Sequence, residues 1–107
     1  SLLGNIYAAR VERIAEGIQG AFLEIGEGQK CYYSLSGEQP IKLSPGHENK
    51  LYGGDVILVQ ITKDAVKTKL PVCTGNVSLD GKYFVLLSQK NVSVFQKKFE
   101  RKRKERD

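Results

Sequence analysis

Two aromatic residues, Phe22 and Tyr32, fall on the polar side of alternating stretches of sequence. Successive side chains of a strand point to opposite faces, so the core face of residues 18–26 is the one that carries Ala21, Leu23 and Ile25. Phe22 lies on the other face, and the alternation over residues 30–35 places Tyr32 beside Lys30 on the polar side. Aromatic rings that stack on bases, at about 1–3 kcal/mol per base, commonly hold single-stranded nucleic acid. The two rings therefore predict a nucleic-acid-binding face.

Basic residues stand near this predicted face and could neutralise phosphates. They are Lys30 on the same polar side, Arg10 and Arg13 in the preceding run, and Lys69 after the run 55–62. A packing alternative stays open for the aromatic pair, in which the end of the chain covers Phe22 with Phe95 or Phe99. Tyr7 and Tyr33 are predicted to be core or flanking residues.

The remaining chemistry-bearing residue types form no catalytic or metal-binding pattern. The sequence has one histidine, His47, without a second His or Cys at ligand spacing, whereas zinc sites take several such donors and nucleophilic catalysis needs a paired base. Cys31 and Cys73 are predicted to be buried, reduced thiols. The carboxylates at the ends of apolar runs are interpreted as solvated or turn residues: Asp55, Asp64 and Asp80. We therefore expect no catalytic residue and no metal site in this chain.

Short apolar runs separated by turn residues predict five or six strands, at residues 6–14, 18–26, 30–35, 55–62, 72–79 and 82–87. Residues 36–53, with their glycines and prolines, are predicted to be a loop with one helical turn. Asp80-Gly81 predicts a hairpin between the last two strands. Phe95 and Phe99, four residues apart in a charged run, predict a short basic helix.

Evenly spaced short strands without a long amphipathic helix favour a small closed barrel over a sandwich. We expect an all-β, five-stranded barrel of the oligonucleotide/oligosaccharide-binding (OB) class, extended at its C-terminus by a hairpin and a short basic helix. The pattern leaves an SH3-like or another small barrel open. Barrels of the OB class bind ligands on the face of their second and third strands, which here are the strands of Phe22 and Tyr32.

The positive charge is concentrated at the end of the chain. The 107 residues carry a formal net charge of +5. Seven cations and three acids lie in residues 97–107, so residues 1–96 contribute only +1 to the net charge. A basic segment indicates a polyanion partner, with a solvated helix end as the alternative. No apolar run approaches the roughly 18 residues of a membrane span, and no signal-peptide pattern is present. We expect one cytoplasmic domain without a membrane partner, cut from a longer polypeptide because the sequence begins at Ser1 and lacks methionine.

Several stretches, in this order, resemble the S1 domain of the ribonuclease E/G family: Asn5-Ile6-Tyr7, Gly20-Ala21-Phe22-Leu23-Glu24-Ile25-Gly26, residues 54–64 (GDVILVQITKD), residues 77–87 (VSLDGKYFVLL) and Gln96-Lys97-Lys98-Phe99-Glu100. The resemblance covers nearly the whole chain. It implies an S1-type OB barrel over residues 1–79, and an extension over residues 80–107 that leads to the next domain of the parent. It also implies that the parent is a homo-oligomeric, magnesium-dependent endoribonuclease, with Mg²⁺ bound in a catalytic domain outside this N-terminal fragment.

The resemblance implies roles for particular residues. Phe22 and Tyr32 match the family's two RNA-contacting aromatics, and Lys69 matches its basic contact on this face. The family has Phe where Tyr32 stands, and a Tyr keeps the stacking plane while it adds a hydroxyl. Gly81 and Val85 match part of a pocket that senses the 5′-monophosphate end of RNA.

We interpret the chain as a module that binds single-stranded RNA with low sequence specificity. It would position RNA for cleavage by the neighbouring nuclease domain of a ribonuclease E/G-like parent, in RNA processing and decay, and would have no catalytic activity alone. The alternative is a structural or protein-interaction barrel whose aromatic face docks on other domains of the parent or on a partner. Salt dependence separates the two, because phosphate contacts make affinity fall steeply with salt.

Overall fold

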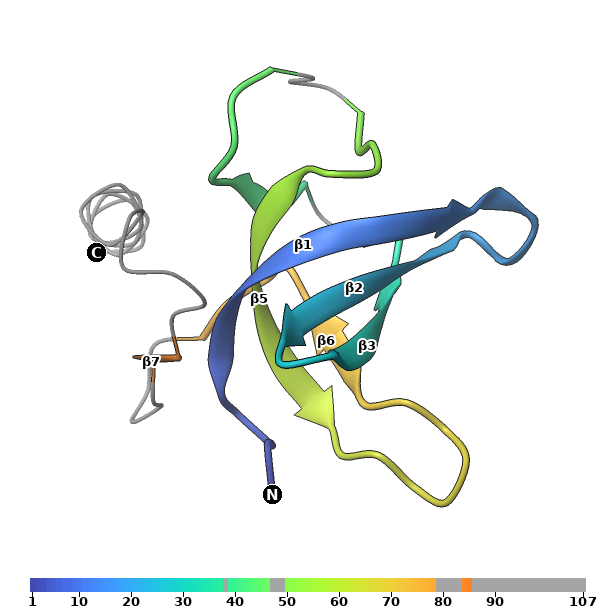
Figure 1. Cartoon of the computed structure of the whole chain (residues 1–107), viewed down its shortest axis with the longest axis vertical. Coiled ribbons are helices and arrows are strands. Elements are labelled where there is room, and N and C mark those ends of the chain that lie inside the picture. The colour runs from blue at the N-terminus through green and yellow to red at the C-terminus, as the bar shows by residue number, and fades with distance from the viewer. Residues whose placement is uncertain (38, 47–49, 79–83, 86–107) are drawn as a thin grey trace.

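The computed structural model describes residues 1–37, 39–46 and 50–78, together with the backbone of residues 84–85. Its elements are β1 (Ile6–Ala15), the 3-10 turn η1 (Glu16–Ile18), β2 (Gly20–Gly26), β3 (Gln29–Ser34), β4 (Ile41–Lys42), β5 (Val56–Lys63), β6 (Val72–Thr74) and β7 (Phe84–Val85) (Figure 1). Among these described residues, no helix is long and apolar enough to cross a membrane.

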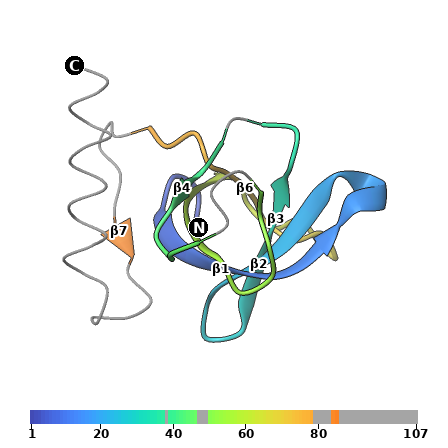
Figure 2. The same cartoon turned by 90° about the horizontal axis from the view of Figure 1, so that it is seen from above.

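Five of the strands close into a barrel. The sheet order is β4-β5-β6-β3-β2-β1-β7, and an additional pairing of β5 with β1 joins the ends of the five central strands. The barrel pairs are antiparallel except for β3 and β6, which run parallel. Figure 2 shows the strands curving around a closed ring. This confirms the predicted all-β, five-stranded barrel of the OB type.

The alternation in β2 and β3 orients their side chains as predicted. The inward side chains of the two strands are almost fully buried: Ala21, Leu23, Ile25, Cys31 and Tyr33. Burying one large aliphatic side chain such as Leu23 contributes roughly 1.5–3 kcal/mol, and a shift of register by one residue would expose the whole set. The core therefore fixes which residues point outward, and these include Phe22 and Tyr32. Tyr7 is also buried in the core, as expected.

Two connections differ from the sequence-based prediction. The loop predicted over residues 36–53 contains β4, which pairs antiparallel with β5, and its described residues include no helical segment. β7 pairs in parallel with β1 and not with β6, so the predicted hairpin pairing is wrong. The reason is that β5 and β3 already occupy both edges of β6. The predicted hairpin turn at Asp80-Gly81 and the predicted basic helix lie outside the described residues, as does the 80–107 extension apart from β7.

Asp55, the residue before β5, is buried, which corrects its interpretation as a solvated residue. Only 5% of its side chain is exposed, and its Oδ2 lies 3.4 Å from Nζ of Lys42 in β4. The same oxygen accepts a hydrogen bond from the backbone N–H of Tyr52 at 2.9 Å, while Lys42 donates to the carbonyl of Lys50 at 2.5 Å. This ion pair ties β4 to the loop that precedes β5.

Candidate nucleic-acid interface

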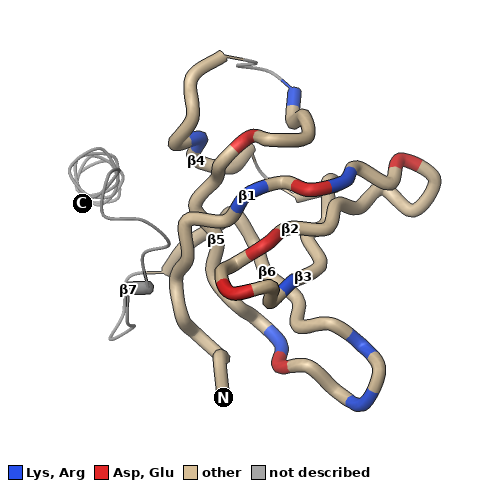
Figure 3. The backbone as a smooth tube through the Cα atoms, viewed as in Figure 1, with Lys and Arg blue, Asp and Glu red and all other residues tan. Residues whose placement is uncertain are grey.

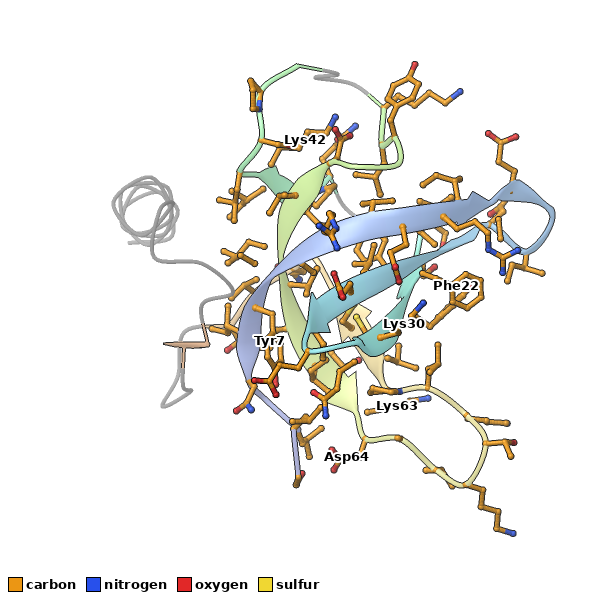
Figure 4. All side chains as sticks on the ribbon, in the orientation of Figure 1. Tyr7, Phe22, Lys30, Lys42, Lys63 and Asp64 are labelled. Atoms are coloured by element: carbon orange, nitrogen blue, oxygen red, sulfur yellow. The ribbon has the colours of Figure 1, made fainter. Side chains whose placement is uncertain are left out.

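Phe22 and Tyr32 lie side by side on the outside of the barrel. They are directly opposed in the register of β2 and β3, and their ring centroids are 6.0 Å apart at an interplanar angle of 66°. Both side chains are half-buried, and Figure 4 shows Phe22 pointing away from the barrel on the side where Lys30 also lies. The structure thus brings the two predicted aromatics together as one pair. The angle is that of an edge-to-face pair, so the two ring planes face in different directions.

A β-bulge in β1 adds Arg13 to this pair. The register of β1 against β2 shifts between Val11 and Arg13, so that Arg13 stands opposite Phe22. A bulge of this kind lets two consecutive residues project on the same side of a sheet, and here both Glu12 and Arg13 are exposed. The guanidinium carbon of Arg13 lies 4.8 Å from the centroid of the Phe22 ring. One face of Phe22 therefore carries a cation, which a base can stack on or displace.

The other two cations predicted for the strands, Arg10 and Lys30, lie on this face but already have acidic partners. Arg10 forms an ion pair with Glu24 on β2, and Lys30 forms one with Glu12, at 3.0 Å. Exposed ion pairs of this type are worth at most about 1 kcal/mol, so phosphates could compete for the cations. Their charges are compensated in the free protein, and we do not expect them to dominate phosphate binding.

The loop between β5 and β6 adds further positive charge without acidic partners in the described part of the chain. Lys69 lies in it as predicted. The sequence-based prediction did not single out Lys67 in the same loop or Lys63, the last residue of β5 (labelled in Figure 4). Figure 3 shows blue basic segments along this loop. All three lysines are exposed, and within the described part of the chain none of them forms an ion pair. Paired backbone hydrogen bonds between Val66 and Lys69, at 2.8 and 3.2 Å, close the loop tip. The spacing of three lysines in a polar run was the available sequence signal.

The C-terminal end of the loop between β5 and β6 is joined to Tyr32 of the aromatic pair. The backbone N–H of Tyr32 donates to the carbonyl of Pro71 at 2.8 Å, and Tyr32 pairs with Val72 in the parallel β3–β6 ladder. At the N-terminal end of the loop, Asp64 accepts hydrogen bonds from the Ser1 hydroxyl at 2.7 Å and the Leu2 N–H at 3.0 Å. The Ser1 hydrogen bond is the largest cause that lowers the pKa of the Asp64 carboxyl. Hydrogen bonds therefore hold the loop between β5 and β6 at both of its ends.

Two predicted positions are not placed by the structure. Gly81 lies outside the described residues, and Val85 is described only as backbone in β7, where it pairs with Tyr7 of β1. The predicted pocket for the 5′ end of RNA therefore stays a prediction. Among the residues that the structure does describe, no group of three or more His, Cys, Asp or Glu side chains could hold a metal ion.

A separate hollow of about 240 Å³ lies beside the loop between β3 and β5. Its lining includes Tyr33, Lys42 and Lys50. Lys42 is engaged by Asp55, and the ammonium of Lys50 lies 5.7 Å from the centroid of the Tyr52 ring. Burial is the main cause that raises the pKa of Tyr33 to about 12. Without a stacking pair, this hollow suits a nucleic acid less well than the face of Phe22 and Tyr32.

The two cysteines are buried thiols, as predicted, and the structure places them in contact. The sulfur atoms of Cys31 on β3 and Cys73 on β6 are 3.1 Å apart inside the core. The contact with Cys31 and burial both raise the pKa of the Cys73 thiol far above its usual value. Because the thiolate is the reactive form, Cys73 is held in an unreactive state, and burial shields Cys31 from solvent.

We expect both thiols to resist labelling in the folded protein. At pH 8 the native chain should react with a disulfide reagent such as dithionitrobenzoate far more slowly than the chain in denaturant, where both thiols are exposed to the reagent and Cys73 regains ordinary acidity. The measurement is the release of thionitrobenzoate over time. Fast labelling of one or two thiols without denaturant would contradict the buried pair.

Comparisons with known proteins extend over most of the chain. No protein-family model matches it. It is 33% identical over 89 residues to ribonuclease E of a Nostoc species, which covers 79% of this chain and 13% of that protein. It is 30% identical over 97 residues to ribonuclease G of Escherichia coli, with 80% of this chain and 20% of that protein covered. A ribonuclease E/G-like protein of Porphyra purpurea is 33% identical over 89 residues, with coverages of 79% and 17%. The chain thus spans no more than a fifth of these relatives.

Proposed function

Because the chain belongs to the ribonuclease E/G family, we propose that its barrel holds single-stranded RNA for a nuclease domain elsewhere in a longer parent. The observation that supports this most is the pairing of Phe22 with Tyr32 on the outer face, next to a loop with exposed lysines. Rings that stack on bases beside cations that neutralise phosphates are what single-stranded nucleic acid requires. The parent would be a magnesium-dependent endoribonuclease, and its metal site, oligomer contacts and catalytic residues would lie outside this chain.

Each part of the site would have its own role. Bases would stack on Phe22 and Tyr32, with Arg13 as a third planar group beside Phe22. The phosphates would follow the lysines of the loop between β5 and β6. Stacking tolerates every base, because each base has a π-face, so the module would bind with low sequence specificity. Its contribution to cleavage would be to position the strand, which lowers the entropy cost of the reaction.

The lysines at the loop between β5 and β6 should carry much of the salt dependence. A Lys63→Gln, Lys67→Gln, Lys69→Gln variant should bind single-stranded RNA more weakly at low salt and show a flatter plot of log affinity against log salt. Each phosphate that a protein neutralises on a single strand adds about 0.7 to the steepness of this plot, so three phosphates amount to roughly two units. Titrations of a fluorescent RNA at several salt concentrations measure this slope.

Lys50→Gln is the control for that variant, because Lys50 is an exposed lysine in the loop before β5, where it lines the separate hollow. It should leave the slope nearly unchanged. If the triple variant and wild type give the same slope, Lys63, Lys67 and Lys69 do not contact phosphates. RNA binding that is absent or insensitive to salt would favour the alternative, a barrel that docks on protein surfaces.

A further inference from the structure

Gly20 lies on the outer face of β2, and the ring of Tyr32 occupies the space that a side chain there would need. A Cβ atom added to Gly20 would lie 2.3 Å from Cε2, 2.6 Å from Cζ and 2.5 Å from the hydroxyl oxygen of Tyr32. Carbon atoms in non-bonded contact pack at about 3.5–4.0 Å, so the ring rests directly on the backbone of Gly20. Gly20 is not among the glycines with positive φ. An alanine there would therefore conflict with the Tyr32 ring and not with the backbone conformation.

A hydrogen bond holds the hydroxyl at the tip of the Tyr32 ring. The hydroxyl donates to the carbonyl of Ile18 at 3.4 Å, across the turn between β1 and β2. That turn is itself fixed to the end of β3, since the N–H of Leu35 donates to the carbonyl of Gln19 at 2.8 Å. The ring of Tyr32 thus has Gly20 beneath it, Ile18 at its tip and Phe22 beside it. A Phe at this position would lack the hydrogen bond to Ile18.

We propose that Gly20 is a positioning residue for RNA binding, which sets the place of the Tyr32 ring beside Phe22. This rests on the proposed function of the aromatic pair. A ring held in its binding position before RNA arrives loses less conformational entropy on binding. A methyl group at Gly20 would push the ring off β2, break its contact with the Ile18 carbonyl and change its angle to Phe22. Because the ring is the mobile end of a half-buried side chain, the fold would absorb the change while the binding site would not.

The test compares Gly20→Ala with Gly17→Ala in the full chain. Gly17 lies three residues away in the turn η1, where an added Cβ would meet nothing within 4 Å, so its replacement controls for the loss of a glycine nearby. Gly20→Ala should weaken binding of a single-stranded RNA roughly fivefold to tenfold, part of the value of one stacked base, and Gly17→Ala should bind as wild type. The thermal midpoint of both should stay within a few degrees of wild type.

A second measurement separates positioning from a general structural effect. In a Tyr32→Ala background, Gly20→Ala should cause no further loss of affinity, because the ring through which it acts is absent. By NMR, the α protons of Gly20 should show a ring-current shift in wild type that disappears in Tyr32→Ala.

Three results would overturn the proposal. They are wild-type affinity in Gly20→Ala, an equal loss in the Tyr32→Ala background, and an unshifted Gly20 signal in wild type. If Gly20→Ala binds normally while alanine at both Phe22 and Tyr32 abolishes binding, only the positioning role fails. If the double alanine variant also binds normally, the proposed function fails with it.

Discussion

Replacing Asp55 with alanine is expected to lower the free energy of unfolding by about 3 kcal/mol, at the lower end of the range for breaking a buried ion pair. The change leaves the ammonium of Lys42, whose side chain is only 12% exposed, without its carboxylate. It also removes the acceptor for the Tyr52 N–H. In a domain of this size each kcal/mol shifts the thermal midpoint by roughly 4–8 °C, so the melting temperature should fall by roughly 12–24 °C.

Glu12→Ala provides the comparison for this variant, since it breaks an ion pair that is exposed. Glu12 pairs with Lys30 at 3.0 Å, and half of the lysine side chain is accessible to water. Its loss should cost no more than about 1 kcal/mol. Thermal and urea unfolding followed by circular dichroism measure both variants. Equal stability of Asp55→Ala and wild type would mean that Asp55 is solvated after all.

Period-2 alternation was sufficient to predict the core residues of β2 and β3 and the outward aromatics. In β2 and β3 the inward residues are all apolar, so a single register buries them, and Phe22 and Tyr32 follow on the opposite face. The even spacing of the strands likewise predicted the barrel. Local patterns succeed in β2 and β3 because each of these strands buries one face. Consecutive residues of β1 and β5 are buried, so alternation does not describe the burial in these two strands.

Contacts that depend on tertiary structure were not predictable in this way. Strict alternation gives no sign of the bulge that places Arg13 opposite Phe22. Asp55 has the sequence context of a turn residue, and only the fold shows that Lys42 reaches it. The Asp80-Gly81 signal favours a local hairpin, whereas the neighbours of β6 leave it no free edge and β7 pairs with β1.

Charge on the proposed face also depends on partners that the sequence does not reveal. Arg10 and Lys30 lie on the same face as the aromatic pair, but ion pairs with Glu24 and Glu12 compensate them. We therefore expect the lysines of the loop between β5 and β6 to contribute more to phosphate binding, because they have no such partners in the described structure.

Alanine at both Phe22 and Tyr32 is expected to cause the largest loss of RNA affinity. Each stacked base is worth about 1–3 kcal/mol, and because the rings touch, their losses need not add. A combined loss of about 2 kcal/mol or more corresponds to roughly a 30-fold weaker affinity or worse. The rings are half-buried and lie outside the core, so the double variant should remain folded.

Tyr52→Ala is the matched control for that variant. Tyr52 is an exposed aromatic, 42% accessible, in the loop before β5, so its removal deletes a ring without changing the face of Phe22 and Tyr32. Circular dichroism and the melting temperature of both variants establish that each is folded before RNA is added.

The most direct test of the RNA-binding face is a fluorescence-anisotropy titration of a short, unstructured RNA at near-physiological ionic strength. Wild type, Phe22→Ala with Tyr32→Ala, and Tyr52→Ala are compared side by side. We expect a loss of roughly 30-fold or more for the double variant, and wild-type affinity for Tyr52→Ala. Equal affinity of wild type and the folded double variant would show that RNA, if bound at all, is not held by Phe22 and Tyr32.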